Sequence, residues 1–266
     1  MNNLYKMLVT DIDGTIVDHG SRGEDIDIDH PVKVGIKNAQ SLGKIVTIAT
    51  GRNYHNAKFV IKAFGITDPV IVNGGARIIN PVSDEVLWEK RLKREIAQKI
   101  TKYVNDTRQD ADLFIGFGQK EILFSDMVDD DLEDLIYLAF IDISDRAEAD
   151  RLVKMVSTLP DVRAGFVPSP KSRGRFCVTV TDEEATKSHA LNKLQDMLGV
   201  TVAETIALGD GHNDLPLFAA SGLKVAVDNA DPLLKAAADM VVPSFHEHGM
   251  LQVIDDYLIG TEGQKS

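Results

Sequence analysis

The chain has 266 residues, which is long for one domain and short for two large ones. Charged residues make up 26% and hydrophobic residues 44%, ordinary values for a globular protein with a sizeable core. The 41 acidic side chains outnumber the 29 basic ones, so the formal net charge is −12. This balance argues against a nucleic-acid partner, because binding to a phosphate backbone needs a basic face. A small phosphorylated molecule stays open as a partner, since it needs only a local cluster of donors.

The sequence carries no pattern typical of export or membrane insertion. Its first residues, MNNLYK, lack the apolar stretch of a signal peptide. No apolar run is long enough to span a bilayer. The single Cys177 cannot form an internal disulfide, which suits a reducing compartment. We therefore expect a cytoplasmic protein without a membrane partner.

The first third of the chain alternates between strand and helix patterns. Apolar, β-branched runs predict strands, and amphipathic stretches that end at glycine predict helices. The expected order is a strand at 5–10, a helix at 32–42, a strand at 45–49, a helix at 54–64 and a strand at 69–72. This alternation is typical of a doubly wound α/β fold.

After about residue 80 the pattern changes. Leu92, Ile96, Ile100 and Val104 recur every four residues and predict an amphipathic helix at 89–104. A second helix is expected at 145–158, with Ser144 as its N-cap. Short strands are predicted between and after these helices, at 113–117, 121–124, 135–141, 162–167 and 175–180. Adjacent strands mixed with helices in this way indicate a separate α+β module.

The β/α alternation returns in the last third of the chain. Strands are expected at 205–209 and 223–227, and helices at 215–220 and 231–238. The predicted architecture is therefore a doubly wound, Rossmann-like parallel sheet interrupted by an inserted α+β module. The expected boundaries are 1–82 and 184–266 for the two parts of the core, and 83–183 for the insertion.

Asp11 and Asp13 follow an apolar strand in the stretch KMLVTDIDGTIVD. Side chains two residues apart on an extended chain point to the same side, so the two acids should share one site while Ile12 turns away. Ligands of open α/β sheets bind beyond the carboxyl ends of the strands. Two acids there can divide the work of a transfer reaction, one attacking and the other handling protons. A surface turn is the alternative, because Asp-Gly is common in turns.

Other polar residues follow strands or begin helices. Thr50 and Gly51 come after the second strand, where a hydroxyl and free backbone N–H groups suit a phosphate, although Thr-Gly is also an ordinary strand-to-helix turn. Lys187, near a helix start, would offer a compact positive charge to a phosphoryl group, although most lone lysines are solvated. The stretch LGDGHNDLPLF repeats the pattern of strand, acid, glycine and acid. Its Asp210, Asn213 and Asp214 offer oxygens of the kind that Mg²⁺ prefers, and an ordinary turn is again the alternative.

In order along the chain, DIDGT, ATGR, the later lysine and GDGHND resemble the four motifs of the haloacid dehalogenase superfamily. Their spacing is similar to that of Cof-type (subclass IIB) phosphatases, which carry a C2B-type cap between the second and third motifs. The stretches VNGGARI and DNADPLLKAAADMVVPSFHEHGML look similar as well. Ser188 stands where a glycine often follows the motif lysine, and His212 fills a variable position.

The resemblance implies a Mg²⁺-dependent phosphatase that hydrolyses a small phosphomonoester, such as a sugar phosphate, through an aspartyl-phosphate. Asp11 would be the nucleophile, and Asp13 the general acid and base. The resemblance also implies ligands and phosphate contacts: Mg²⁺ held by Asp11, the Asp13 backbone carbonyl and Asp210 with Asp214 in support, and the phosphoryl group by Thr50, Gly51 and Lys187 with Asn213 orienting the site.

The identity of the substrate is left open by the sequence. Asn73, His212, Arg173 and Arg175 are candidates for contacts with it. A phosphomutase of the same superfamily is one alternative function, and a regulatory protein that kept the fold without activity is another. A regulatory protein of this kind should have lost an essential acid, whereas the sequence keeps all four, Asp11, Asp13, Asp210 and Asp214. Monomer and homodimer both stay possible.

Overall fold

The computed structural model divides into two compact units, each with its own hydrophobic core. The first unit comprises Met1–Trp88 and Thr186–Ser266, and the second comprises Glu89–Ala185. The structure describes residues 4–24, 26–27, 29–107, 112–117, 120–123, 135–168 and 174–260.

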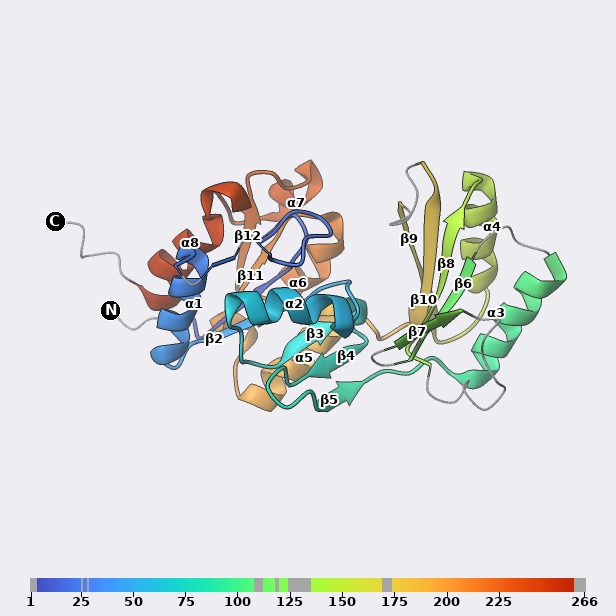
Figure 1. Cartoon of the computed structure of the whole chain (residues 1–266), viewed down its shortest axis with the longest axis horizontal. Coiled ribbons are helices and arrows are strands. Elements are labelled where there is room, and N and C mark those ends of the chain that lie inside the picture. The colour runs from blue at the N-terminus through green and yellow to red at the C-terminus, as the bar shows by residue number, and fades with distance from the viewer. Residues whose placement is uncertain are drawn as a thin grey trace. The chain divides into compact units, whose positions relative to one another are not determined.

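A five-stranded parallel sheet forms the centre of the first unit (Figure 1). Its order is β13-β12-β11-β1-β2, so β1 lies between β11 and β2 and pairs with both. The central strands β1 and β11 are fully buried, as expected for parallel strands covered on both faces, whereas the edge strand β13 is partly exposed. The strands are β1 (Met7–Thr10), β2 (Ile45–Ile48), β11 (Thr205–Gly209), β12 (Leu223–Val227) and β13 (Met240–Val242).

Helices flank this sheet (Figure 1), and two of them carry caps that the sequence encodes. Asn53 accepts a hydrogen bond from the Asn56 N–H at the start of one helix, and Thr186 accepts one from His189 at the start of another. The helices are α1 (Pro31–Ser41), α2 (Tyr54–Phe64), α5 (Lys187–Leu198), α6 (Leu215–Ala219), α7 (Pro232–Ala237), α8 (Gly249–Val253) and the π-helix η7 (Ile254–Ile259).

The third predicted strand, β3 (Val70–Val72), does not continue the parallel sheet. It leads an antiparallel sheet of order β3-β4-β5, with β4 (Arg77–Ile79) and β5 (Val86–Glu89), and meets the end of β2 through a parallel bridge between Ala49 and Ile71. The cause is the tight 3₁₀ turn η1 (Asn73–Gly75), which reverses the chain directly after β3. The short strands β4, β5 and β13 were not predicted from the sequence.

The second unit is built on an antiparallel sheet of order β7-β6-β8-β10-β9. Its helices, α3 (Arg94–Thr107) and α4 (Arg146–Val156), pack on the sheet through side chains such as Ile96, Leu152 and Phe140. The strands are β6 (Asp112–Phe117), β7 (Lys120–Leu123), β8 (Tyr137–Ile143), β9 (Val162–Pro168) and β10 (Phe176–Asp182).

Three details differ from what was expected from the sequence. The N-cap of α4 is Asp145, whose side chain accepts a hydrogen bond from the Ala147 N–H, and not Ser144. The helix predicted from residue 89 begins at Arg94, because Glu89 is the last residue of β5 and residues 90–93 connect the strand to the helix. The first unit accordingly extends to Trp88, which packs against its core, whereas the sequence analysis ended this part at residue 82. Within the described part of the chain, no helix is long and apolar enough to cross a membrane.

Candidate active site

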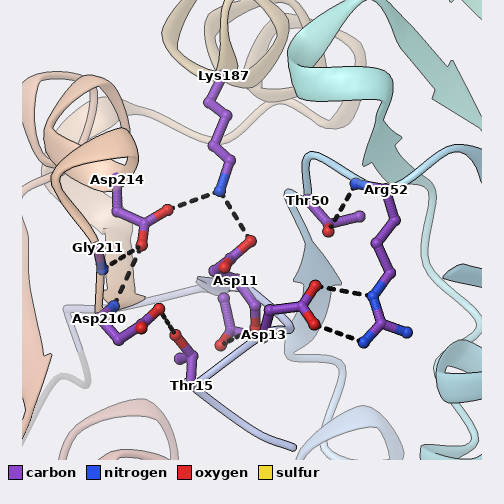
Figure 2. Close-up of polar contacts among 10 residues, drawn as sticks. Asp11, Asp13, Thr15, Thr50, Arg52, Lys187, Asp210, Gly211 and Asp214 are labelled. Carbon is purple, nitrogen blue, oxygen red and sulfur yellow. Dashed lines mark hydrogen bonds and ion pairs between the residues drawn. The ribbon is translucent and has the colours of Figure 1, made fainter. Parts of the chain in front are cut away.

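The parallel sheet brings three sequence motifs together at one edge. Asp11 directly follows β1, Thr50 comes just after β2, and Asp210 directly follows β11. Since β1 pairs with both β2 and β11, the carboxyl ends of the three strands meet at that edge. Figure 2 shows that the side chains of Asp11, Thr50 and Asp210 all lie in one cluster.

Lys187 reaches into this cluster from its helix, and its ammonium lies between Asp11 and Asp214 (Figure 2). It is the first residue of α5, and its Nζ donates to Asp11 Oδ1 at 2.8 Å and to Asp214 Oδ1 at 2.6 Å. The three side chains are only 5%, 6% and 0% exposed, respectively. Burial acts to lower the pKa of Lys187, but the two carboxylates outweigh it and raise the pKa, so the ammonium stays charged.

Asp11, Asp210 and Asp214 each offer a carboxylate oxygen, and these oxygens lie within 4.8 Å of one another. Burial raises the pKa of Asp11 to about 7, with Asp214 adding to the rise and Lys187 opposing it. Burial also raises the pKa of Asp210, against a hydrogen bond from Thr15. Crowded acids of this kind favour a bound cation, and an all-oxygen donor set fits a hard ion such as Mg²⁺.

The three acids are not equivalent as metal ligands. Asp214 already accepts hydrogen bonds through both oxygens, from Lys187 at Oδ1 and from the N–H groups of Asp210 and Gly211 at Oδ2, the latter two at 3.1 Å. Asp210 accepts one bond, from the Thr15 hydroxyl at 2.9 Å. Asp11 and Asp210 are therefore better placed as direct ligands, and Asp214 fixes the loop and the lysine behind them.

Asp13 lies on the exposed side of the site and has a different partner. Arg52 holds its carboxylate with a two-pronged ion pair, Nε to Oδ2 at 2.8 Å and Nη2 to Oδ1 at 2.6 Å, and the Gly20 N–H donates to Oδ1 at 2.9 Å. Burial acts to raise the pKa of Asp13, but these bonds outweigh it and lower the pKa. Asp11 and Asp13 line one site, as expected from their spacing, but they turn to separate cations (Figure 2).

Thr50 is buried in the loop between β2 and α2. Its N–H donates to the Ile71 carbonyl at 3.0 Å, and its Oγ1 accepts from the Arg52 N–H at 3.1 Å. The hydroxyl proton of Thr50 can therefore point to a ligand. Gly51, beside it, is exposed, and an exposed glycine leaves its N–H accessible to an anion.

The remaining predicted residues are placed as follows. His212 and Asn213 are exposed in a 3₁₀ turn (His212–Asp214) that begins two residues after Asp210. Asn73 is buried in η1 with φ of 54°, and its Oδ1 is a buried atom without a hydrogen-bond partner. Arg175 is exposed in the second unit, directly before β10, and Arg173 lies outside the described residues.

Sequence reasoning missed three polar residues of the site. Arg52 binds Asp13 and also donates to the Ser21 carbonyl at 2.7 Å. Thr15 donates to Asp210 as described above, and Asn229 Nδ2 donates to the Gly14 carbonyl at 2.7 Å. Thr15, Arg52 and Asn229 all lie within the stretches that carried the resemblance. Their roles were hidden because each bond links segments far apart in the chain.

Gly14 shows why this site needs a glycine. Its φ is +76°, a conformation that other residues rarely adopt, and a Cβ on Gly14 would lie 2.3 Å from Asp210 Oδ2. From the sequence, Asp11 and Asp13 were expected to share one site, with a surface turn as the alternative. In the structure, Lys187 donates hydrogen bonds to both Asp11 and Asp214, so Asp11 lies in a buried polar network and not in a surface turn.

The model of the haloacid dehalogenase-like hydrolase family matches residues 8–254. The chain belongs to this family. A 5-amino-6-(5-phospho-D-ribitylamino)uracil phosphatase, YwtE of Bacillus subtilis, is 26% identical, and the match covers 96% of this chain and 99% of that protein. A phosphoglycolate phosphatase of Halobacterium salinarum is 29% identical over 93% of this chain and 95% of its own length.

Solved structures of the family share the fold. A protein from Eubacterium rectale is 23% identical, with a TM-score of 0.80 over 96% of this chain and 99% of its own. The subclass IIB sugar phosphatase BT4131 is 20% identical, with a TM-score of 0.73. The match covers 95% of this chain and 98% of that one. The fold class and the resemblance stated from the four motifs are therefore confirmed. So is the expectation of an enzyme of this superfamily, whose full-length relatives named above are phosphatases.

Without a divalent cation, the stability of the protein should fall as the pH rises from about 4 to about 7. The folded state holds a proton on Asp11, with a pKa of about 7, which the unfolded chain releases near 3.8. Asp11→Asn removes this titration. Melting temperatures measured in a chelator at pH 5 and pH 8 should therefore fall more for the wild type than for Asp11→Asn. Asp18→Asn, an exposed acid nearby, should behave like the wild type. An equal fall in Asp11→Asn would contradict the burial argument.

Proposed function

We propose that the protein is a Mg²⁺-dependent phosphatase that hydrolyses a small phosphomonoester by way of a phosphoryl group carried on Asp11. The observation that carries the proposal is the position of Lys187 Nζ, buried between Asp11 and Asp214 at the edge of the sheet. A nucleophile, a fixed positive charge and a cation site within one cluster are the parts that phosphoryl transfer needs, because its catalysis is mostly positioning and charge stabilisation.

In the first step, a carboxylate oxygen of Asp11 attacks phosphorus, and the bond from phosphorus to the ester oxygen breaks. Lys187 and the Thr50 hydroxyl stabilise the negative charge on the transferring oxygens, and Asn213 orients the loop beside them. Asp13 gives its proton to the leaving oxygen. In the second step, water attacks the phosphorus of the aspartyl-phosphate, and Asp13 takes a proton from that water. The bond between phosphorus and the Asp11 oxygen breaks, which releases inorganic phosphate and restores the carboxylate of Asp11.

Mg²⁺ would be held by Asp11, Asp210 and the backbone carbonyl of Asp13. When bound, it supplies positive charge to the phosphoryl oxygens and offsets the repulsion between the acids. Asp214 would support these ligands through its bonds to Lys187 and to the 210–211 backbone.

The ion pair between Asp13 and Arg52 adds a requirement to this mechanism. A carboxyl group that is to donate a proton must first be protonated, and Arg52 and Gly20 favour the ionised form of Asp13. Asp13 must therefore leave the Arg52 guanidinium, or loosen its bonds to it, when the substrate binds. The partial exposure of Asp13, 27% for the side chain, leaves room for this rotation.

The substrate class follows from the family. Its full-length relatives include phosphatases of phosphoglycolate and of a phosphorylated ribitylamino-pyrimidine, which share a phosphomonoester on a small polar molecule. Asn73, His212, Arg173 and Arg175 are the candidates for contacts with the leaving group. The alternative of a phosphomutase replaces water by a sugar hydroxyl as the acceptor in the second step.

A substrate screen on the purified protein tests the proposal. The panel should contain phosphoglycolate, several sugar phosphates, nucleotides and pyridoxal phosphate, each with and without Mg²⁺. Release of inorganic phosphate from at least one monoester, dependent on Mg²⁺, supports the phosphatase. Isomerisation of a sugar phosphate without phosphate release supports the phosphomutase, and no turnover of any compound supports a regulatory protein.

Asp11→Asn should reduce kcat by at least about 10³-fold, because an amide cannot form the aspartyl-phosphate. Asp18→Asn is the control and should keep wild-type kcat. The assignment fails if Asp11→Asn retains about a tenth of the wild-type rate while the protein is folded by circular dichroism.

Asp13→Ala should slow alkyl phosphates more than aryl phosphates such as p-nitrophenyl phosphate. An alkoxide needs a proton in order to leave, whereas p-nitrophenolate does not, and general acid catalysis typically contributes about 10²-fold or more. Steady-state rates on both substrates decide the matter. Equal losses would remove the general-acid role from Asp13.

Activity should disappear in a chelator and return with Mg²⁺. Asp210→Asn should raise the Mg²⁺ concentration for half-maximal activity by at least about tenfold, because a ligand carboxylate is lost. Asp196→Asn, an exposed acid on α5, is the control. An unchanged Mg²⁺ titration in Asp210→Asn would take this residue out of the ligand set.

Arg175→Ala should change the order of preferred substrates, mainly through KM. A contact with the leaving group that is equally strong in ground and transition states affects KM and not kcat. Lys187→Ala should instead lower kcat for every substrate. Arg151→Ala, an exposed arginine of α4, is the control. If Arg175→Ala keeps the wild-type order and KM values, the contacts with the leaving group lie elsewhere.

A further inference from the structure

The turn η1 lies between two segments that both contribute to the site. On one side, the Asn73 N–H donates to the Arg52 carbonyl at 2.8 Å, and the Gly74 N–H donates to the Thr50 carbonyl at 3.0 Å. These backbone bonds attach the turn to the loop that carries Thr50. They do not depend on any side chain of the turn.

On the other side, Gly75 packs against the start of α5. A Cβ on Gly75 would lie 2.1 Å from the carbonyl carbon of Thr186 and 2.6 Å from the backbone N of Lys187. Both neighbours are main-chain atoms, so they cannot turn aside as a flexible side chain could. Gly75 also has φ of +106°, which favours glycine. The main chain of residues 186–187 therefore rests directly on the turn.

The position of this main chain decides where the Lys187 ammonium lies. Lys187 is the first residue of α5, directly after the N-cap Thr186, whose Oγ1 accepts from the His189 N–H at 3.1 Å. Its Nζ reaches two acids that follow other strands, at 2.8 Å and 2.6 Å. A side chain at position 75 would push the helix start away from the turn and move the ammonium from both acids.

We propose that Gly75 is a positioning residue for phosphoryl transfer, because it sets the distance from the Thr50 loop to the first turn of α5 and so aims Lys187 at Asp11 and Asp214. The inference rests on the proposed function, in which Lys187 stabilises the transferring phosphoryl group. It goes further by naming the contact that keeps the lysine and the threonine, which come from separate segments, at a fixed separation.

Gly75→Ala and Gly74→Ala form a matched pair of variants. Both glycines have positive φ, +106° and +67°, so both alanines strain the backbone. A Cβ on Gly74, however, meets no atom within 4 Å, and alanine keeps the N–H that bonds Thr50. With p-nitrophenyl phosphate as the probe, Gly75→Ala should lower kcat by about 10²-fold, the typical cost of a misplacement near 1 Å. Gly74→Ala should stay within a few-fold of the wild-type kcat.

A double-mutant cycle separates positioning from a general loss of structure. If Gly75 acts through Lys187, then Gly75→Ala combined with Lys187→Ala should be no slower than Lys187→Ala alone. A further loss of the same size in the double variant would overturn the inference. So would wild-type kcat in Gly75→Ala. Wild-type kcat in Lys187→Ala would instead overturn the role of the lysine in the proposed function, which keeps the two failures distinct.

The N-cap of α5 provides a second test in case Gly75→Ala does not fold. Thr186→Ala removes the oxygen that fixes the first turn of the helix, whereas Thr186→Ser keeps it. Thr186→Ala should lower kcat several-fold, non-additively with Lys187→Ala, and Thr186→Ser should restore it. Equal kcat values in Thr186→Ala and the wild type would contradict the idea that the position of this first turn aims the lysine.

Discussion

The buried ion pairs of Lys187 with Asp11 and Asp214 are the interaction on which the site depends. Charges that are almost fully removed from water are costly unless they are paired and hydrogen-bonded. Here three clustered carboxylates face one ammonium, and the pKa of Asp11 is raised to about 7 as a result of its burial. One divalent cation would bring these four groups to neutrality. The fold thus keeps an excess of negative charge at this edge of the sheet. That excess favours the binding of a cation.

The parallel sheet makes such a cluster possible at low conformational cost. Because β1 pairs with β11 on one side and β2 on the other, the ends of three strands are fixed within the first unit. Hydrogen bonds from Thr15 to Asp210 and from Asn229 to Gly14 then join loops that leave different strands. The acids that could hold a cation therefore lie on loops that are tied to one another. Asp13 is more exposed than Asp11 and Asp214, and it is held by Arg52 and by the Gly20 N–H.

Local signals in the sequence predicted the core elements well. Helix α2 was predicted at its observed bounds with Gly65, whose φ is 72°, as its end; the structure adds the cap that Asn53 provides at its start. The strand at 205–209 was likewise predicted at its bounds. Ser144 and Asp145 are neighbouring residues that can both cap a helix, and nothing in the sequence shows which of them reaches the free N–H. Strands of three or four residues such as β4 and β5 carry too little periodicity to be recognised.

The site could be predicted as a set of residues but not as a network. The order of the motifs pointed to Asp11, Asp13, Lys187, Asp210 and Asp214, and these residues do meet at one edge of the sheet. The pairing of Arg52 with Asp13 could not be foreseen, because it depends on how the segment around Gly20 and Ser21 folds back. The burial of Lys187 could not be foreseen either, since it arises from long-range packing.

The inserted second unit ends at Ala185, only two residues before Lys187. A movement of the chain that returns from the second unit would therefore displace Lys187, unless the main chain were held in place just before it. The contact between Gly75 and the Thr186 main chain lies at this junction and can serve as a mechanical anchor. With such an anchor, an insertion can be lengthened, shortened or exchanged during evolution while the reactive centre keeps its geometry. The same feature marks residue 186 as a natural joint for building chimeric enzymes on this core.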